Sequence, residues 1–291
     1  MDARPAMKAQ FIYRHFQFEG QQGFGWLDLA QLDGTLLALD WVVGETHRIW
    51  GSAVMVAPGV ALTARHVVDA MCHKGFLTEG GGYLRALGFS QDGIASWNTD
   101  GFTAGDGDLS VLTLVGATAH PAPAAEKVVA VKLATLAARQ PSVGESISLV
   151  GFAASEIEFE TSKNDPAGIG LFVSVGTVIN VYGAGRDRSL PNPSIGVSAK
   201  TINGMSGGAA FDSQGRLIGI ITSGMGENPS FISLSWPSAF APIEIAWPPG
   251  LIKGATTLHD MAQKGFCRIE GIEALRIRID GNGELSAGLD L

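Results

Sequence analysis

Short apolar runs separated by turn residues recur along the whole chain. LLALDWVV at 36–43 predicts a strand, and RIWGSAVMVAPGVALT at 48–63 predicts two, because Ala57-Pro58-Gly59 interrupts the apolar run. In the second half, strands are predicted at residues 145–152, 170–182, 194–200, 208–212, 216–223 and 231–236. Many short strands with regularly spaced turns are typical of antiparallel sandwiches and barrels. The pattern therefore predicts an all-β protein.

The remaining segments predict connections and a few further elements. A polar-aromatic alternation at 10–19 indicates another short strand, and a short helix is expected after Thr63. Residues 79–107 are rich in Gly, Asp, Ser and Asn and include a loop-like segment at 98–108, and LSVLTLV at 109–115 predicts a half-buried strand. HPAPAAEK at 120–127 is the candidate for an interdomain linker. Near the end of the chain, 256–265 predicts a short helix and 276–286 a hairpin.

The composition excludes several classes of protein. With 46% hydrophobic residues among 291, the chain can bury a sizeable core. A formal net charge of −8 and the lack of a basic run argue against nucleic acid or an anionic membrane as a partner. No stretch approaches the roughly 20 apolar residues that span a bilayer, and the first residues do not form a secretory signal. As given, the sequence is therefore expected to be cytoplasmic.

Two cysteines, Cys72 and Cys267, lie far apart and lack metal-ligand spacing. A disulfide scaffold would use more cysteines, so both are expected to be free, partly buried thiols. The sequence also contains no HExxH motif and no close Cys/His cluster. We therefore expect neither a metal nor a cofactor.

A glycine-rich segment carries the first candidate for chemistry. GMSGGAAF at 204–211 flanks Ser206 with glycines, which allow a sharp turn and a close approach to a substrate carbonyl. Two amide N–H groups aimed at one point can stabilise an oxyanion. Glycine-rich turns that contain serine are also common as structural features, so this segment alone does not decide between the two.

A serine nucleophile needs a base, and His66 is the candidate, because it follows an apolar strand at the first turn of the expected helix. The base needs a carboxylate to orient it. Asp108 lies at a loop-to-strand junction where its side chain can turn inward, whereas Asp106 lies among glycines and suits a solvated turn. Taken singly, His66 could equally be a capping or partly buried residue, and Asp108 a loop cap.

Together these segments resemble the trypsin/chymotrypsin superfamily. ALTARHVV, GDLSVLTL and GMSGGAAF occur in the order His, Asp, Ser, the Asp 42 residues after the His and the Ser 98 residues after the Asp. This order excludes α/β-hydrolases and subtilisins. The resemblance covers about residues 48–240. It implies two six-stranded antiparallel β-barrels of the chymotrypsin type, at 41–125 and 126–245, with the active site in the cleft between them and extensions at 1–40 and 246–291.

Within the superfamily, TARHVV, GRLIGIITSG and Trp236-Pro237 look most like the bacterial Deg-type (HtrA) branch. Val67 stands where secreted trypsins have a cysteine, and Met205 stands where zymogen-activated trypsins have the Asp that pairs with the freed N-terminus. The 54 residues after Pro237 are too few for the PDZ domain that many Deg proteases carry.

The resemblance also implies roles for individual residues. His66 would take the proton from Ser206 and donate it to the leaving amine, while Asp108 would orient the imidazole. The N–H groups of Gly204 and Ser206 would form the oxyanion hole. The implied substrate-binding residues are Lys200, Thr201, Ile221, Thr222, Ser223, Gly224, Ser233 and Ser235. Lys200, at the base of the pocket, either selects acidic residues through a buried ammonium or bends out to solvent.

The sequence thus predicts a serine endopeptidase that acts on protein or peptide substrates, with a regulatory protein partner as one means of control. The alternative is a protease fold kept as a binding or regulatory module within a larger complex.

Overall fold

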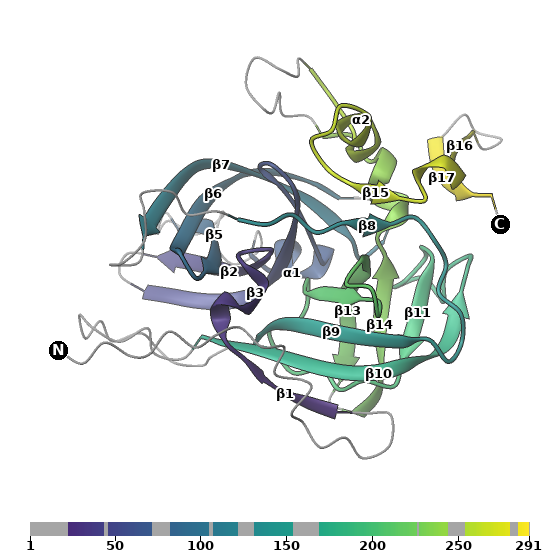
Figure 1. Ribbon diagram of the computed structural model, residues 1–291, viewed down its shortest axis with the longest axis horizontal. Coiled ribbons are helices and arrows are strands. Elements are labelled where there is room, and N and C mark those ends of the chain that lie inside the picture. Colours follow the sequence, from purple (N-terminus) through teal and green to yellow (C-terminus); the bar gives the residue numbers. More distant parts are fainter. Residues whose placement is uncertain are drawn as a thin grey trace.

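Two β-barrels packed side by side form the body of the computed structural model, with extensions at both ends of the chain (Figure 1). The structure describes residues 23–43, 46–71, 82–104, 107–121, 131–153, 169–225, 227–243, 254–279 and 285–290. Both barrels are closed, antiparallel and six-stranded. The predicted chymotrypsin-like architecture is therefore confirmed.

The first barrel consists of six strands in the order β2-β3-β4-β7-β6-β5. Their bounds are β2 (Leu36–Val43), β3 (Thr46–Ala57), β4 (Val60–Thr63), β5 (Tyr83–Ser90), β6 (Gly93–Ala104) and β7 (Ser110–Pro121). The turn between β3 and β4 falls at Pro58 and Gly59, as the sequence predicts. The expected short helix, α1 (Arg65–Met71), follows β4 after a single residue.

The second barrel closes through the pairing of β12 with β13 and has the order β12-β9-β10-β11-β14-β13. Its strands are β9 (Ser146–Ala153), β10 (Gly170–Tyr182), β11 (Ser194–Val197), β12 (Ala209–Phe211), β13 (Leu217–Met225) and β14 (Glu227–Leu234). All six strands predicted in this half of the chain are present within a few residues of their expected bounds.

The loop predicted at 98–108 is wrong for residues 98–104, which lie in β6, and no strand is predicted anywhere in the stretch 79–107. This segment contains β5 and β6, which pair with each other and with β2 and β7. On β5, Leu84 and Ala86 are buried while Tyr83 is exposed. This alternation is the period of a strand, but the Gly, Asp, Ser and Asn content of the whole stretch conceals it. The closed barrel supplies ladder hydrogen bonds on both sides of each strand.

Short strands from outside the barrels are added to the second barrel. β1 (Gly23–Leu27), in the N-terminal extension, pairs with β10. β8 (Leu136–Ala137) pairs in parallel with β13, and β15 (Ile269–Glu270), from the C-terminal extension, pairs in parallel with β8. Both chain extensions are therefore anchored to the same barrel.

The C-terminal extension contains the expected elements. α2 (Leu258–Gln263) matches the predicted helix, and β16 (Leu275–Ile279) with β17 (Leu285–Leu289) forms the predicted hairpin. The expected strand at 10–19, Cys72 and residues 122–127 of the candidate linker lie outside the described residues. No described helix is long and apolar enough to cross a membrane.

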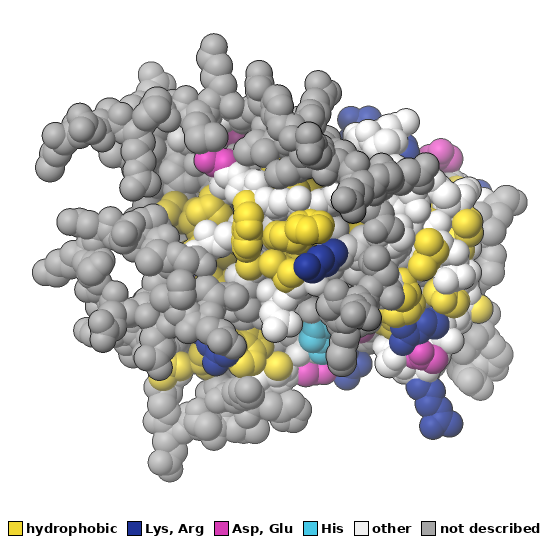
Figure 2. Space-filling view, turned by 90° about the horizontal axis from the view of Figure 1, so that it is seen from below, with side chains coloured by type: hydrophobic (Ala, Val, Ile, Leu, Met, Phe, Trp, Pro, Cys, Tyr) yellow, Lys and Arg dark blue, Asp and Glu magenta, His cyan; other side chains and the backbone are white. Residues whose placement is uncertain are grey.

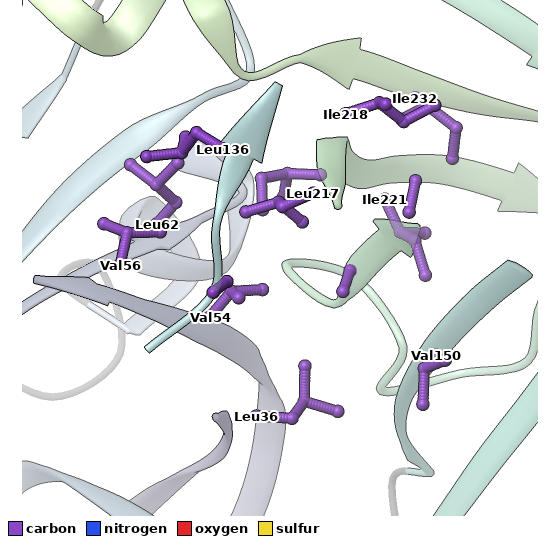
Figure 3. Close-up of a cluster of buried hydrophobic side chains, with 14 of the residues drawn as sticks. Leu36, Val54, Val56, Leu62, Leu136, Val150, Leu217, Ile218, Ile221 and Ile232 are labelled. Atoms are coloured by element: carbon purple, nitrogen blue, oxygen red, sulfur yellow. The ribbon is translucent and has the colours of Figure 1, made fainter. Parts of the chain in front are cut away.

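One hydrophobic cluster crosses the boundary between the barrels (Figure 3). Its labelled side chains are Leu36, Val54, Val56 and Leu62 of the first barrel, Leu136 of β8, and Val150, Leu217, Ile218, Ile221 and Ile232 of the second. All of them are buried. Burying apolar surface contributes about 25 cal/mol per Å². The shared core therefore stabilises one arrangement of the two barrels, and this arrangement gives the cleft between them a defined shape.

Candidate active site

α1 presents His66 at the surface of the first barrel. Val67 and Val68 are buried in the inner core of that barrel, each 2% exposed. Successive residues of a helix point about 100° apart, so burying these two valines turns His66 outward. The His66 side chain is 48% exposed.

The Asp108 carboxylate holds His66 by two hydrogen bonds. Oδ2 lies 2.7 Å from His66 Nδ1, and Oδ1 accepts the backbone N–H of His66 at 2.8 Å. Because an ionised carboxylate only accepts, a neutral His66 ring facing it carries its proton on Nδ1 and has Nε2 as its acceptor. Asp108 thus orients the imidazole and also caps the first turn of α1.

Residues 202–208 form a tight turn, here called the 202–208 turn, between the two barrels. Gly204 has a φ of 91° and Gly207 a φ of 83°, a region that favours glycine. The bonded N–H groups of the turn donate from Met205 to the Ile202 carbonyl, from Gly207 to the Ile221 carbonyl and from Gly208 to the Met205 carbonyl. The turn is therefore held through most of its own peptide groups.

Three of the seven N–H groups of this turn have no acceptor among the described residues, and that of Asn203 is one of them. Among the residues that the structure describes, none accepts a hydrogen bond from the N–H of Gly204 or of Ser206. They are the two groups that the sequence assigns to an oxyanion hole. An oxyanion hole requires two N–H donors that have no other acceptor and are held by the surrounding structure.

The Ser206 side chain is partly buried, and among the described residues its hydroxyl has no hydrogen-bond partner, the His66 ring included. Gly51 shows how near the Ser206 backbone lies to α1. A methyl group at Gly51 would come within 2.6 Å of Val67 Cγ1 and 3.1 Å of the Ser206 carbonyl oxygen. The chain thus brings the residue that follows His66 and the backbone of Ser206 to one point.

Ser52 is a residue of this region that the sequence analysis missed. It lies on β3 next to Gly51, is fully buried, and hydrogen-bonds through its hydroxyl to the Gly204 carbonyl at 3.0 Å. A serine within an apolar strand matches no motif, so only the pairing of segments 152 residues apart reveals it.

A cavity of about 510 Å³ opens beside His66. Its lining residues are Arg65, His66 and Asp69 of α1, Gly107 and Asp108, Arg188 to Pro191 of the β10–β11 loop, and Thr222 of β13. Both barrels therefore contribute to the cavity, and the His66–Asp108 pair lies in its wall.

The loop that lines the far side of the cavity is internally braced. Asp187 accepts hydrogen bonds from the Ser189 backbone, the Ser189 hydroxyl and the Leu190 backbone, and these bonds lower the pKa of its carboxyl. Arg186 pairs with Asp187 and lies over the Phe231 ring. Arg188, in contrast, makes no ion pair among the described residues, so one free cation faces the cavity.

The residues expected to bind substrate do not all lie in this cavity. Thr222 lines it, whereas Ile221, Ser233 and Ser235 are buried within the barrel wall. The buried Thr201 hydroxyl lies 3.1 Å from Ser230 Oγ. Ser223 and Gly224 belong to β13, the expected substrate-pairing strand.

Of the two alternatives for Lys200, the structure has the exposed one. The Lys200 ammonium lies 5.0 Å from the centroid of the Phe24 ring, on the face of the molecule that carries β1. Phe24 and Trp26 are each 55% exposed, and hydrophobic side chains are visible on that face (Figure 2). The structure therefore does not have the buried ammonium that would select acidic residues from the base of a pocket.

The described part of the chain contains no group of three or more His, Cys, Asp or Glu residues that could hold a metal ion. Cys267 is partly buried, and burial raises the pKa of its thiol to about 11.

The chain matches none of the curated proteins. Among solved structures, it is similar to Deg5, at 19% identity and a TM-score of 0.48, over 71% of this chain and 86% of that one. It is also similar to an inactive mutant form of Rv3671c from M. tuberculosis H37Rv, at 13% identity and a TM-score of 0.44, over 70% of this chain and 82% of that one. A family model described as the trypsin-like peptidase domain matches residues 51–220, more than half of the 291 residues, and the chain therefore belongs to that family.

Proposed function

We propose that this protein is a serine endopeptidase with His66, Asp108 and Ser206 as its catalytic residues. The observation that carries the proposal is the 2.7 Å hydrogen bond between His66 Nδ1 and Asp108 Oδ2 in the wall of the cavity, because a neutral ring held in this way has Nε2 available as a base. Catalytic hydrogen bonds are often long or poorly aligned without substrate, so the unbonded Ser206 hydroxyl is compatible with this role.

Each step then uses a group of this chain. Ser206 Oγ attacks the scissile carbonyl carbon while His66 Nε2 accepts the hydroxyl proton, and Asp108 stabilises the resulting imidazolium. The N–H groups of Gly204 and Ser206 stabilise the oxyanion. His66 then donates the proton to the leaving amine, which produces an acyl-enzyme on Ser206. Water, deprotonated by His66, hydrolyses this ester and restores the serine.

Labelling with a fluorophosphonate probe tests the nucleophile directly. We expect the wild-type protein to be labelled at Ser206, and we expect Ser206→Ala and His66→Ala each to abolish labelling and peptide cleavage, because triad members act as a unit. Ser213→Ala, in an exposed turn of the second barrel, is the matched control and should be labelled normally. A folded wild-type protein that neither reacts nor cleaves peptides would instead favour a protease fold kept as a binding or regulatory module.

A further inference from the structure

Ser52 lies where β3, β9 and the 202–208 turn meet. Its hydroxyl donates to the Gly204 carbonyl at 3.0 Å and accepts the Phe152 N–H at 2.8 Å. Its own N–H donates to the Ser206 carbonyl at 2.8 Å, and its carbonyl accepts the Thr63 hydroxyl at 2.7 Å. Every polar group of this fully buried serine is bonded, and two of the four bonds reach the 202–208 turn.

These two bonds determine how the 202–208 turn presents its free N–H groups. A peptide unit is planar, so holding the Gly204 carbonyl fixes the unit that joins Gly204 to Met205, and holding the Ser206 carbonyl fixes the unit that joins Ser206 to Gly207. Between them lies the peptide unit that carries the Ser206 N–H. The peptide unit that joins Gly204 to Met205 also adjoins the peptide unit that carries the Gly204 N–H.

The hydroxyl of Ser52 is the part of this arrangement that a backbone cannot replace. Alanine at position 52 would keep the N–H bond to Ser206 but would leave the Gly204 carbonyl and the Phe152 N–H without a partner at a buried site. Glycine at 204 offers little steric resistance to a rotation of its own peptide unit. The turn would then be free to relax away from the arrangement that holds the peptide units beside the Gly204 and Ser206 N–H groups.

We propose that Ser52 is a positioning residue for the oxyanion hole. It does not touch the substrate; it acts through the carbonyls of Gly204 and Ser206. The role rests on the proposed function, because an oxyanion hole has a meaning only in an acyl-transfer enzyme. Ser52 also adjoins Gly51, which contacts Val67 of α1 and the Ser206 carbonyl, so one dipeptide of β3 positions both the His66 side and the Ser206 side of the site.

Ser52→Ala tests this role, with Ser238→Ala as the matched control. Ser238 is equally a buried serine whose hydroxyl donates to a backbone carbonyl, that of Ser235 at 2.6 Å, but it lies in the 3-10 helix η4 (Trp236–Phe240), and none of its hydrogen bonds involves the 202–208 turn. Ser52→Ala loses two buried side-chain hydrogen bonds and Ser238→Ala loses one. Only Ser52→Ala should change the geometry of the oxyanion donors.

Three measurements separate positioning from simple loss of stability. In Ser52→Ala we expect kcat to fall about 10-fold with KM nearly unchanged, and the affinity for a peptide boronic acid, which mimics the tetrahedral intermediate, to fall by a similar factor. The amides of 203–208 should exchange hydrogen faster than in the wild type. Ser52→Cys, which keeps a weak donor and acceptor, should recover part of kcat. Ser238→Ala should leave all three quantities at wild-type values.

Unchanged amide exchange at 203–208 in Ser52→Ala would overturn the inference whether or not the protein is an enzyme. Faster exchange with wild-type kcat and boronic acid affinity would show that the hydroxyl is structural only, and would overturn it as well. A wild-type protein that lacks both peptidase activity and reactivity with the fluorophosphonate would contradict the proposed function, a result distinct from either of these.

Discussion

Single residues in this site have more than one contact to satisfy, and Asp108 is the clearest case. One carboxylate oxygen receives the His66 ring and the other receives the His66 backbone N–H. The same side chain therefore fixes both the tautomer of the imidazole and the position of the helix that carries it. Substituting Asp108 would consequently change the orientation of the His66 ring, and it would also remove the negative charge beside that ring.

At the same scale, Arg188 and Lys200 differ in where they lie relative to the cavity. Arg188 lines the cavity beside His66, while Lys200 is exposed over the Phe24 ring. Arg188→Glu should lower kcat/KM about fivefold for peptides with Glu on the acyl side of the scissile bond, since pairs of partly exposed charges contribute less than about 1 kcal/mol each. Lys200→Ala should leave that preference unchanged.

This prediction is checked by comparing Glu, Gln and Leu peptides on the wild type and on both variants at low and high salt. The effect of Arg188→Glu should shrink at high salt, because ions screen exposed charges. A preference for Glu that disappears in Lys200→Ala and persists in Arg188→Glu would show that the ammonium reaches the substrate after all.

At the scale of elements, the site depends on how closely α1 and the 202–208 turn pack onto β3. A side chain at Gly51 has no room, because Val67 Cγ1 and the Ser206 carbonyl oxygen already lie within 3.1 Å of where its first carbon would be. Overpacking of this kind costs about 1–3 kcal/mol. Gly51 is therefore the contact through which α1 and the 202–208 turn keep their spacing.

Gly51→Ala should consequently lower the melting temperature and reduce fluorophosphonate labelling, because α1 and Ser206 must move apart. The control is Gly196→Ala on β11, where an added carbon would meet only ordinary contacts at 3.6 Å and beyond. The melting temperature and the rate of fluorophosphonate labelling are measured for the wild type and for both variants. Equal effects of the two substitutions would argue that Gly51 has no special spacing role.

Elements with a strong local signal were predicted from the sequence, and those formed by distant pairing were not. LLALDWVV and GLFVSVGTVINVY match β2 and β10 residue for residue, since their apolar content alone marks them. β5 and β6 were missed, because their residues form strands only when β2 and β7 lie on either side. The same reason hides Ser52, whose partners lie 100 and 152 residues away in sequence.

At the scale of the whole molecule, a network of charges ties the C-terminal extension to the second barrel. Arg139 hydrogen-bonds with Glu145 and Asp212, Arg216 bonds Asp212 at 2.8 Å, and Arg216 also bonds Glu270 of β15 at 3.0 Å. Through these residues the ends of β8, β12 and β15 are held together. Besides its strand pairing with β8, the C-terminal extension is therefore joined to the second barrel through these charged side chains.

This network makes the stability of the protein depend on acid. Hydrogen bonding by Arg139 lowers the pKa of Glu145; burial alone would raise the pKa of Asp212, but its bonds with Arg139 and Arg216 lower it. A carboxyl whose folded pKa is depressed stabilises the fold above its unfolded pKa of about 4, and this contribution is lost as the pH falls through the folded pKa. The melting temperature should therefore drop as the pH is lowered from about 5 to 2.

Asp212→Asn should isolate this contribution, because Asp212 is 5% exposed and its loss would leave Arg139 and Arg216 with one carboxylate fewer. We expect the variant to be less stable than the wild type by about 3 kcal/mol at pH 7, a cost typical of removing one partner of a buried ion pair. The difference should shrink as both proteins are acidified, since the wild-type carboxyl then becomes neutral.

Asp33→Asn, which removes the exposed pair with Lys132, should cost less than about 1 kcal/mol. A gap between wild type and Asp212→Asn that stays constant from pH 7 to pH 2 would mean that Asp212 stabilises the barrel through its shape and turn hydrogen bonds, and not through its charge.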